Sequence, residues 1–113
     1  MKRGVIVLAL FPFTDLSDVK KRPALVVSES GRSDGEAILA FIGTYRGQRL
    51  AASDCLLPNS HPDFQPTGLK ETSFVRLGKL TTLDSTLLLG EIGEISSDLM
   101  TDVDIRLRQA LEL

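Results

Sequence analysis

The sequence contains few of the residues that build metal and redox sites. It has one cysteine and one histidine, Cys55 and His61, in 113 residues. A single cysteine cannot form an internal disulfide, which favours a reducing compartment. One cysteine and one histidine also cannot supply the ligands of the common zinc sites. We therefore expect no metal and no cofactor, with Cys55 as a small core residue and His61 as an exposed loop residue.

The sequence also lacks a long hydrophobic run. Its first apolar segment, Val5–Phe11, has seven residues, whereas a membrane-spanning helix needs about 20. The cations at positions 2 and 3 resemble the start of a signal peptide, but the sequence PFTD follows where a cleavage site of small residues would stand. The segment is therefore predicted to be the first strand of a cytoplasmic protein that does not enter a membrane.

An excess of positive charge is absent as well, since the net charge is −2. The charge is nevertheless unevenly distributed, with a net +3 over residues 1–50 and a net −5 over residues 51–113. This asymmetry fits a local site for an anionic ligand in the first half of the chain, and it also fits an ordinary surface of mixed charge. The chain has no phosphate-binding glycine loop of the P-loop pattern.

Short apolar segments rich in β-branched residues, separated by turn residues, predict a mainly β protein. Residues 28–36 form a cluster of Ser, Gly and Asp, so the second and third strands should form a hairpin. Residues 58–68 hold three of the five prolines and are predicted to be a loop. The expected strands are Val5–Leu10, Ala24–Ser28, Glu36–Ile42, Ala52–Leu57, Leu69–Leu77 and one more within residues 81–95.

The end of the chain, ISSDLMTDVDIRLRQALEL, has apolar residues at helical spacing. Ser96 is a favourable N-cap residue for this helix. Two pairs at i,i+4 spacing, Asp102–Arg106 and Asp104–Arg108, are expected to face water. The pattern as a whole predicts one domain over residues 1–113, a small β-barrel-like sheet with a C-terminal amphipathic helix.

A basic cluster stands in the sequence KKRPALVVSES, where Arg22 precedes Pro23. A proline disfavours helical backbone at the preceding residue, so Arg22 should be held extended at the start of a strand. Its guanidinium could bind a phosphate through two hydrogen bonds and stabilise the extra charge of a pentacoordinate phosphorane. The cluster could equally consist of solvated cations at the entry to a strand.

Two long stretches carry a resemblance to a known family. MKRGVIVLALFPFTDLSDVKKRPALVVS is similar to the opening of MazF/PemK-type toxins of type II toxin–antitoxin systems, with their Arg-Gly start, first strand, Phe-Pro-Phe-Thr-Asp-like loop and Arg-Pro dipeptide. GLKETSFVRLGKLTTLDSTLLLGEIGEISSDLM resembles their Ser-x-Val-Arg-like strand, Thr-Leu-Asp turn and Gly-x-Ile-Gly-x-Ile-Ser entry to the last helix. The matches keep their order over nearly the full length.

This resemblance implies an SH3-like β-barrel with helices, usually a homodimer. It also implies metal-independent, sequence-specific cleavage of single-stranded RNA such as mRNA, leaving a 2′,3′-cyclic phosphate, and a cognate antitoxin that blocks the RNA groove. Family catalysis uses the arginine of Arg-Pro, here Arg22, and a Ser or Thr at the end of the third strand. Because arginine is a poor general base, Arg22 would mainly stabilise transition-state charge.

The sequence departs from the family pattern at that second residue. Gly43 stands where the family has its hydroxyl, and Thr44 follows one residue later. A shift of one residue in a strand turns a side chain to the opposite face. A bulge at Gly43 could redirect Thr44 into the site, and without one Thr44 would point away. Thr44 is therefore the candidate partner of Arg22.

The residues that follow, Tyr45, Arg46 and Arg49, combine an aromatic ring with cations. Such a combination suits stacking of a splayed base and binding of its phosphates, although a hairpin tip with solvated arginines has the same composition. Lys20 and Lys21 are expected to attract RNA rather than to take part in chemistry.

Two further functions fit the same fold. The protein could be a binding module that has lost catalysis at Gly43 but keeps RNA or the antitoxin as its ligand. It could also be a gyrase poison of the CcdB type, although its acidic, amphipathic C-terminus carries no distinctive motif for that action.

Overall fold

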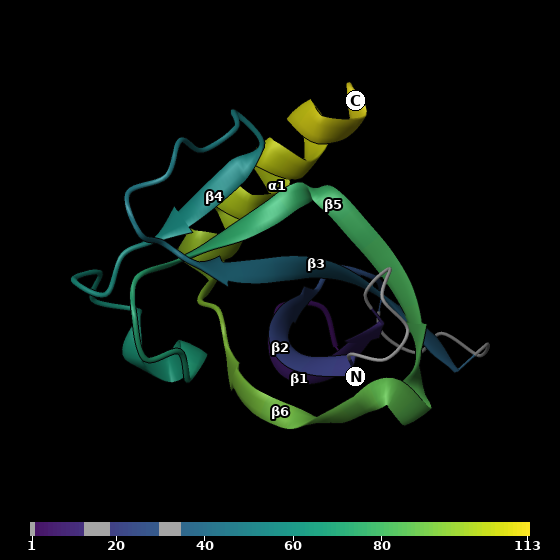
Figure 1. The fold of residues 1–113 in the computed structure, drawn as a ribbon. Helices are drawn as coiled ribbons and strands as arrows, with labels where there is room; N and C mark the ends of the chain where they lie inside the picture. Colours follow the sequence, from purple (N-terminus) through teal and green to yellow (C-terminus); the bar gives the residue numbers. More distant parts are fainter. Residues whose placement is uncertain (1, 13–18, 30–34) are drawn as a thin grey trace.

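The described part of the chain is mainly β, with one long helix at its C-terminal end (Figure 1). The computed structural model describes residues 2–12, 19–29 and 35–113. Its elements are β1 (Val5–Pro12), β2 (Val19–Val26), β3 (Glu36–Thr44), β4 (Asp54–Leu57), the 3-10 helix η1 (Gln65–Thr67), β5 (Ser73–Asp84), the 3-10 helix η2 (Ser85–Leu87), β6 (Leu88–Glu94) and α1 (Ser97–Leu111).

The six strands form one antiparallel sheet in the order β4-β5-β3-β2-β1-β6. The sheet is strongly curved in Figure 1, but β4 and β6 are its two edges, so the strands do not close into a barrel. The expectation of a mainly β fold with a C-terminal helix is confirmed, and the expected antiparallel pairing of the second and third strands is confirmed by β2 and β3. The turn between them lies largely outside the described residues.

Several strand boundaries differ from the sequence-based prediction, most clearly those of β2 and β5. The second strand was expected to begin at Ala24, whereas β2 begins at Val19 and contains Arg22. Pro23 is tolerated there because β2 pairs with β3 only from Ala24 onward, so its missing N–H interrupts no ladder bond to β3. The fifth strand was expected over Leu69–Leu77, whereas β5 runs over Ser73–Asp84.

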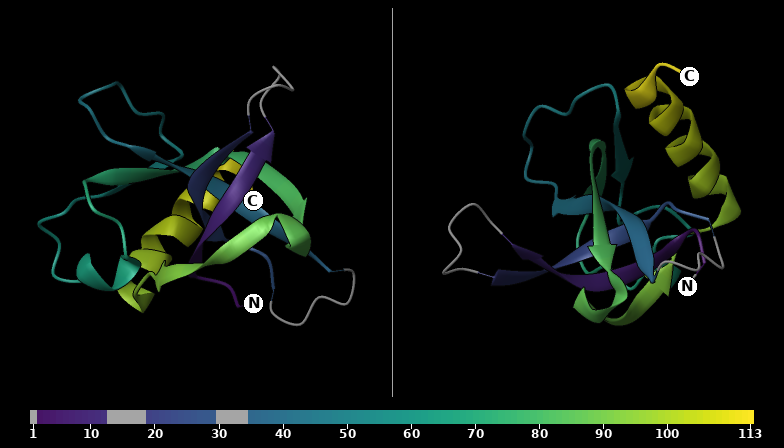
Figure 2. Two further views of the ribbon diagram at one scale, coloured as in Figure 1. Left: turned by 60° about the horizontal axis from the view of Figure 1, so that its bottom comes forward. Right: turned by 90° about the vertical axis from the view of Figure 1, so that its right-hand side faces the viewer.

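Alternation along the strands sends apolar side chains to both faces of the sheet. One cluster of buried residues includes Leu25 and Ile42 together with Leu99 and Val103 of α1. The other cluster, which includes Ala24 and Leu39, lies on the opposite face of β2 and β3. Helix α1 packs against β4 and β5, and Figure 2 shows it running along one side of the sheet.

Local sequence signals place α1 correctly. The Ser96 Oγ accepts a hydrogen bond from the Leu99 N–H at 3.2 Å, which confirms the predicted N-cap. The predicted Asp104–Arg108 pair is wrong, because the Asp104 Oδ1 instead accepts a hydrogen bond from the Arg3 Nη2 at 2.6 Å. Of the helices in the described part of the chain, none is long and apolar enough to span a membrane.

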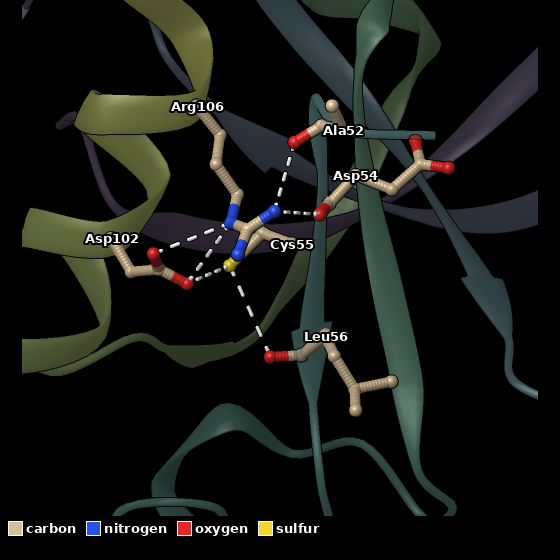
Figure 3. A network of polar contacts seen from close by, with 6 residues as sticks. All are labelled: Ala52, Asp54, Cys55, Leu56, Asp102 and Arg106. Atoms are coloured by element: carbon tan, nitrogen blue, oxygen red, sulfur yellow. Dashed lines mark hydrogen bonds and ion pairs between the residues drawn. The ribbon is translucent and has the colours of Figure 1, made fainter. Parts of the chain in front are cut away.

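The Asp102–Arg106 pair does form and is partly exposed to water, as expected, and Arg106 also links α1 to β4 (Figure 3). The Arg106 Nη1 donates to the carbonyl oxygens of Ala52 at 2.8 Å and Asp54 at 2.9 Å. Cys55 is buried in the core as expected, and its Sγ lies 3.0 Å from the Asp102 Oδ2. Burial, and then the hydrogen bond to Asp102, raise the pKa of Cys55 to about 12, so it remains a thiol.

Candidate functional site

A groove of about 750 Å³ lies where β2 and β3 separate. The two strands pair only over Ala24–Val26 of β2 and Leu39–Phe41 of β3. The part of β2 before Ala24 and the part of β3 after Phe41 are not paired with each other and lie on either side of the groove. A segment that follows η1 and a residue of β6 complete its walls. The lining residues are Leu8, Arg22, Pro23, Phe41, Ile42, Gly43, Thr44, Arg46, Gln48, Gly68, Leu69, Lys70, Glu71, Ser73 and Ile92.

Arg22 is placed in the groove by the pairing of β2 with β1, in which it lies opposite Ala9. Its side chain is half-buried. Within the part of the chain that the structure describes, its guanidinium has no hydrogen-bond or ion-pair partner, unlike Arg3 and Arg106, which both bind carboxylates. A half-buried guanidinium with free donors is well suited to bind an anion such as a phosphate.

Thr44 is the last residue of β3 and lines the same groove as Arg22. The register from Phe41 to Thr44 against β5 is regular, and the irregularity lies between Ala40 and Phe41, so no bulge is present at Gly43. By alternation Thr44 shares a face of β3 with Ile42 and not with Gly43. It reaches the groove nevertheless, because the groove opens between the separated ends of the strands. Its hydroxyl makes no hydrogen bond to any described residue.

Gly43 faces two aromatic rings. A Cβ atom at this position would lie 3.0 and 3.1 Å from atoms of the Phe74 ring and 3.7 Å from the Phe41 ring. The first two distances are tighter than ordinary van der Waals contact. A side chain at position 43, where the resemblance to the family pattern leads us to expect a hydroxyl, would therefore meet the Phe74 ring.

The predicted RNA-binding residues are only partly brought together. Arg46 lines the groove, whereas Lys20, Lys21, Tyr45 and Arg49 are exposed outside it.

The turn that carries Arg46 is held by Gln48, whose Oε1 accepts from the Arg46 N–H at 2.6 Å and whose Nε2 donates to the Thr44 carbonyl at 3.2 Å. Lys70 and Glu71 were missed in the sequence analysis, because only folding brings the end of the proline-rich loop beside β3. The Tyr45 N–H, which donates to the Thr72 carbonyl at 2.9 Å, fixes that proximity.

The segment around the end of η1, which forms one wall of the groove, packs closely against β6. A Cβ atom at Gly93 would overlap the backbone of Thr67, and one at Gly68 would overlap the backbone of Ile92. The buried Thr67 Oγ1 donates to the Phe64 carbonyl at 2.6 Å and accepts from the Leu69 N–H at 3.2 Å. Only glycine allows the backbones at Gly93 and Thr67 to approach so closely, which explains the glycine at this position of β6.

His61 and Cys55 do not line the groove. His61 is half-buried in the proline-rich loop, not fully exposed as predicted, and its Nδ1 accepts from the Asp63 N–H at 3.0 Å. Among the described residues, no group of three or more His, Cys, Asp or Glu side chains is arranged to hold a metal ion.

Solved structures with the same fold come from several bacteria. An endoribonuclease in complex with its cognate antitoxin from a mycobacterial species has a TM-score of 0.78 and 21% identity, over 100% of this chain and 96% of that chain. The Mycobacterium tuberculosis toxin MazF-mt6 has a TM-score of 0.76 and 19% identity, over 96% and 97%. MazF of a MazE–MazF complex from Deinococcus radiodurans has a TM-score of 0.76 and 18% identity, over 100% and 96%.

No curated protein matches the chain in sequence. The sequence does match, over residues 2–111, the family described as a PemK-like, MazF-like toxin of type II toxin–antitoxin systems. That match spans almost all of the chain, including β2 with Arg22 and the end of β3 with Thr44. The protein therefore belongs to the PemK-like, MazF-like toxins of type II toxin–antitoxin systems.

Proposed function

We propose that the protein is an endoribonuclease toxin that cleaves single-stranded RNA, including mRNA, at short specific sequences without a metal ion. The observation that carries this proposal is the half-buried guanidinium of Arg22, which has no partner among the described residues and lines a groove together with Thr44 and Arg46. Family membership and solved relatives named as endoribonucleases support it.

In the proposed reaction the 2′-oxygen of a ribose attacks the adjacent phosphorus, and the bond from phosphorus to the 5′-oxygen breaks. The products are a 2′,3′-cyclic phosphate and a 5′-hydroxyl. Arg22 stabilises the charge that develops on the phosphorane oxygens. Glu71 is the carboxylate among the lining residues, so it can accept the proton that leaves the 2′-hydroxyl. The departing 5′-oxygen takes up a proton from solvent water, which the Thr44 hydroxyl can relay by accepting one proton as it gives up its own, and Glu71 afterwards returns its proton to the solvent.

The proposal includes the partners that the family uses. A cognate antitoxin would neutralise the toxin by occupying the groove, as expected for a relative of a toxin solved with its antitoxin. We further propose that the chain acts as one domain over residues 1–113, assembles as a homodimer and works in the cytoplasm.

The test is cleavage of a long single-stranded RNA in EDTA by purified wild-type protein and by Arg22→Ala. We expect Arg22→Ala to lower the cleavage rate about 100-fold or more, because a preorganised charge in the site is lost. Arg108→Ala is the matched control, since Arg108 is an exposed arginine of α1 outside the groove. Products should carry a 5′-hydroxyl that polynucleotide kinase labels without prior dephosphorylation.

Equal cleavage by wild type and Arg22→Ala, or cleavage by neither, would contradict the proposal.

Thr44→Val tests the second residue, because valine keeps the shape of threonine without its hydroxyl. A slower cleavage rate with unchanged RNA affinity supports a role for Thr44 in proton transfer, and an unchanged rate excludes one.

One observation favours a second candidate function, binding of RNA without cleavage. The ring of Phe74 lies against Gly43, the position at which the resemblance to the family leads us to expect a hydroxyl. A binding module would hold RNA in the groove through Arg22 and release no cleavage products. The EDTA assay, combined with a binding measurement, separates this function from the first.

A further inference from the structure

Two aromatic rings from different strands meet beside Arg22. The rings of Phe11 in β1 and Phe41 in β3 have centroids 5.6 Å apart and an interplanar angle of 77°, an edge-to-face contact. Both side chains are half-buried, and Phe41 lines the groove. The edge-on contact with Phe11 holds the Phe41 ring in place.

The strand register explains why Arg22 belongs to the same surface. In the pairing of β1 with β2, Ala9 lies opposite Arg22 and Phe11 lies two residues further along the same face. In the pairing of β2 with β3, Ala24 lies opposite Phe41. Because alternate residues of a strand share a face, the side chain of Arg22 emerges between the positions of the two rings. The small side chains at positions 9 and 24 leave room for them.

A cation lies over the Phe41 ring. The Nζ of Lys79 is 5.6 Å from the ring centroid. The register of β3 and β5 is irregular next to Phe41. Ala40 pairs with Leu80, but Phe41 pairs with Arg76. The three residues of β5 between these partners, which include Lys79, therefore form a bulge. Lys79 is exposed and makes no ion pair with any described residue. This ring face is therefore covered by a flexible cation and not by the core.

We propose that Phe41, supported by Phe11, is a stacking site for one base of single-stranded RNA, next to the phosphate bound by Arg22. An aromatic ring beside cations is the arrangement with which proteins hold unpaired bases and their phosphates. When a base covers the ring, Lys79 moves to a phosphate of the same strand. This inference rests on the proposed function, because it places the substrate of that reaction in the groove.

The first experiment measures binding of a nine-nucleotide 2′-O-methyl RNA of randomised sequence, labelled with fluorescein, by fluorescence anisotropy. This RNA has no free 2′-hydroxyl, so it binds without being cleaved. We expect Phe41→Leu to weaken binding about 10-fold, because base–aromatic stacking is lost, and Phe41→Tyr to bind like the wild type. Leu89→Ala is the control, because Leu89 is an exposed apolar residue of β6 outside the groove.

A second measurement does not depend on the stability of Phe41→Leu. The protein has no tryptophan, so Phe41→Trp places a single fluorescent reporter at the site. Stacking of a base on the indole should quench its fluorescence as the 2′-O-methyl RNA is added. Leu89→Trp should show no quenching, and sodium polyglutamate, a polyanion without bases, should not quench Phe41→Trp.

Several results would overturn the inference. If Phe41→Leu binds the RNA with the affinity of the wild type, stacking on position 41 is excluded. Stacking is also excluded if Phe41→Trp binds the RNA and its tryptophan fluorescence is not quenched. Equal quenching by polyglutamate assigns the effect to charge alone. Failure of the wild type to bind any RNA overturns the proposed function together with this inference, whereas RNA cleavage through Arg22 without stacking on position 41 overturns the inference alone.

Discussion

At the residue scale, one glycine limits which side chains fit at the end of β3. The resemblance to the family pattern places a hydroxyl at position 43, where this chain has Gly43 and the Phe74 ring fills the adjacent space. Thr44, one residue later, reaches the groove from the opposite face of β3. A side chain at position 43 would therefore meet the Phe74 ring, whereas Thr44 lines the groove.

This arrangement predicts that Gly43→Thr does not raise the cleavage rate. The added side chain should push against Phe74 and lower the free energy of unfolding by about 1–3 kcal/mol, the usual cost of overpacking. Gly78→Thr is the matched control on β5, because a Cβ atom at Gly78 would meet only the Ser53 Oγ at 3.2 Å. Urea denaturation gives the stabilities, and the RNA assay gives the rates.

Faster cleavage by Gly43→Thr would show that the family's hydroxyl position is still usable, against the present interpretation. The double variant Gly43→Thr/Phe74→Leu provides a further check. Because Phe74 is buried, Phe74→Leu alone also lowers stability. Gly43→Thr should nevertheless cost less in the Phe74→Leu background than in the wild type if the contact with Phe74 is the cause.

At the element scale, α1 is attached to the sheet by polar contacts as well as by its apolar face. Arg106 reaches from α1 to two backbone carbonyls before and within β4, and Asp102 holds its guanidinium in place. Sequence spacing alone indicated only a pair along the helix surface. The same carboxylate accepts a hydrogen bond from the Cys55 thiol, which joins the cysteine to the network.

We expect Arg106→Gln to lower the free energy of unfolding by about 1.5–3 kcal/mol, because hydrogen bonds from a charged donor to β4 are lost. Arg108→Gln, in the same helix, should change it by less than about 0.5 kcal/mol, as is usual for surface substitutions. Urea denaturation followed by far-UV circular dichroism measures both. Equal effects of the two substitutions would show that the link to β4 contributes nothing to stability.

At the scale of the whole molecule, local charge outweighs net charge. The protein carries a net charge of −2. Among the residues that the structure describes, however, the groove is lined by three cations, Arg22, Arg46 and Lys70, and by one carboxylate, Glu71. A slightly acidic protein can therefore present a positive groove to RNA.

If these three cations each contact a phosphate, the logarithm of the RNA affinity should fall with the logarithm of the salt concentration with a slope of about −2, from about −0.7 per phosphate on single strands. Lys70→Gln should reduce the slope by about 0.7. Anisotropy titrations of the 2′-O-methyl RNA at several salt concentrations measure the slope. A slope near zero would exclude phosphate contacts in the groove.

Local patterns determined much of this protein. The Ser96 cap and the helical spacing of apolar residues predicted α1, and the β-branched segments predicted most strands, because these signals act over a few residues. The sequence predicted the ends of the strands less accurately, as at β2 and β5. Pairing with strands that are distant in the sequence decides where a strand ends. The order of short motifs was enough to indicate the family.

The tertiary structure decided the chemistry of the groove. Three features depend on the register between strands that are distant in the sequence: the placement of Arg22 in the groove, the Phe74 ring over Gly43 and the contact of Phe11 with Phe41. No local pattern specifies such a register, because it follows from how the whole sheet buries its two apolar faces. The sequence thus determined which groups the protein has, and the packing of the sheet decided which of them meet.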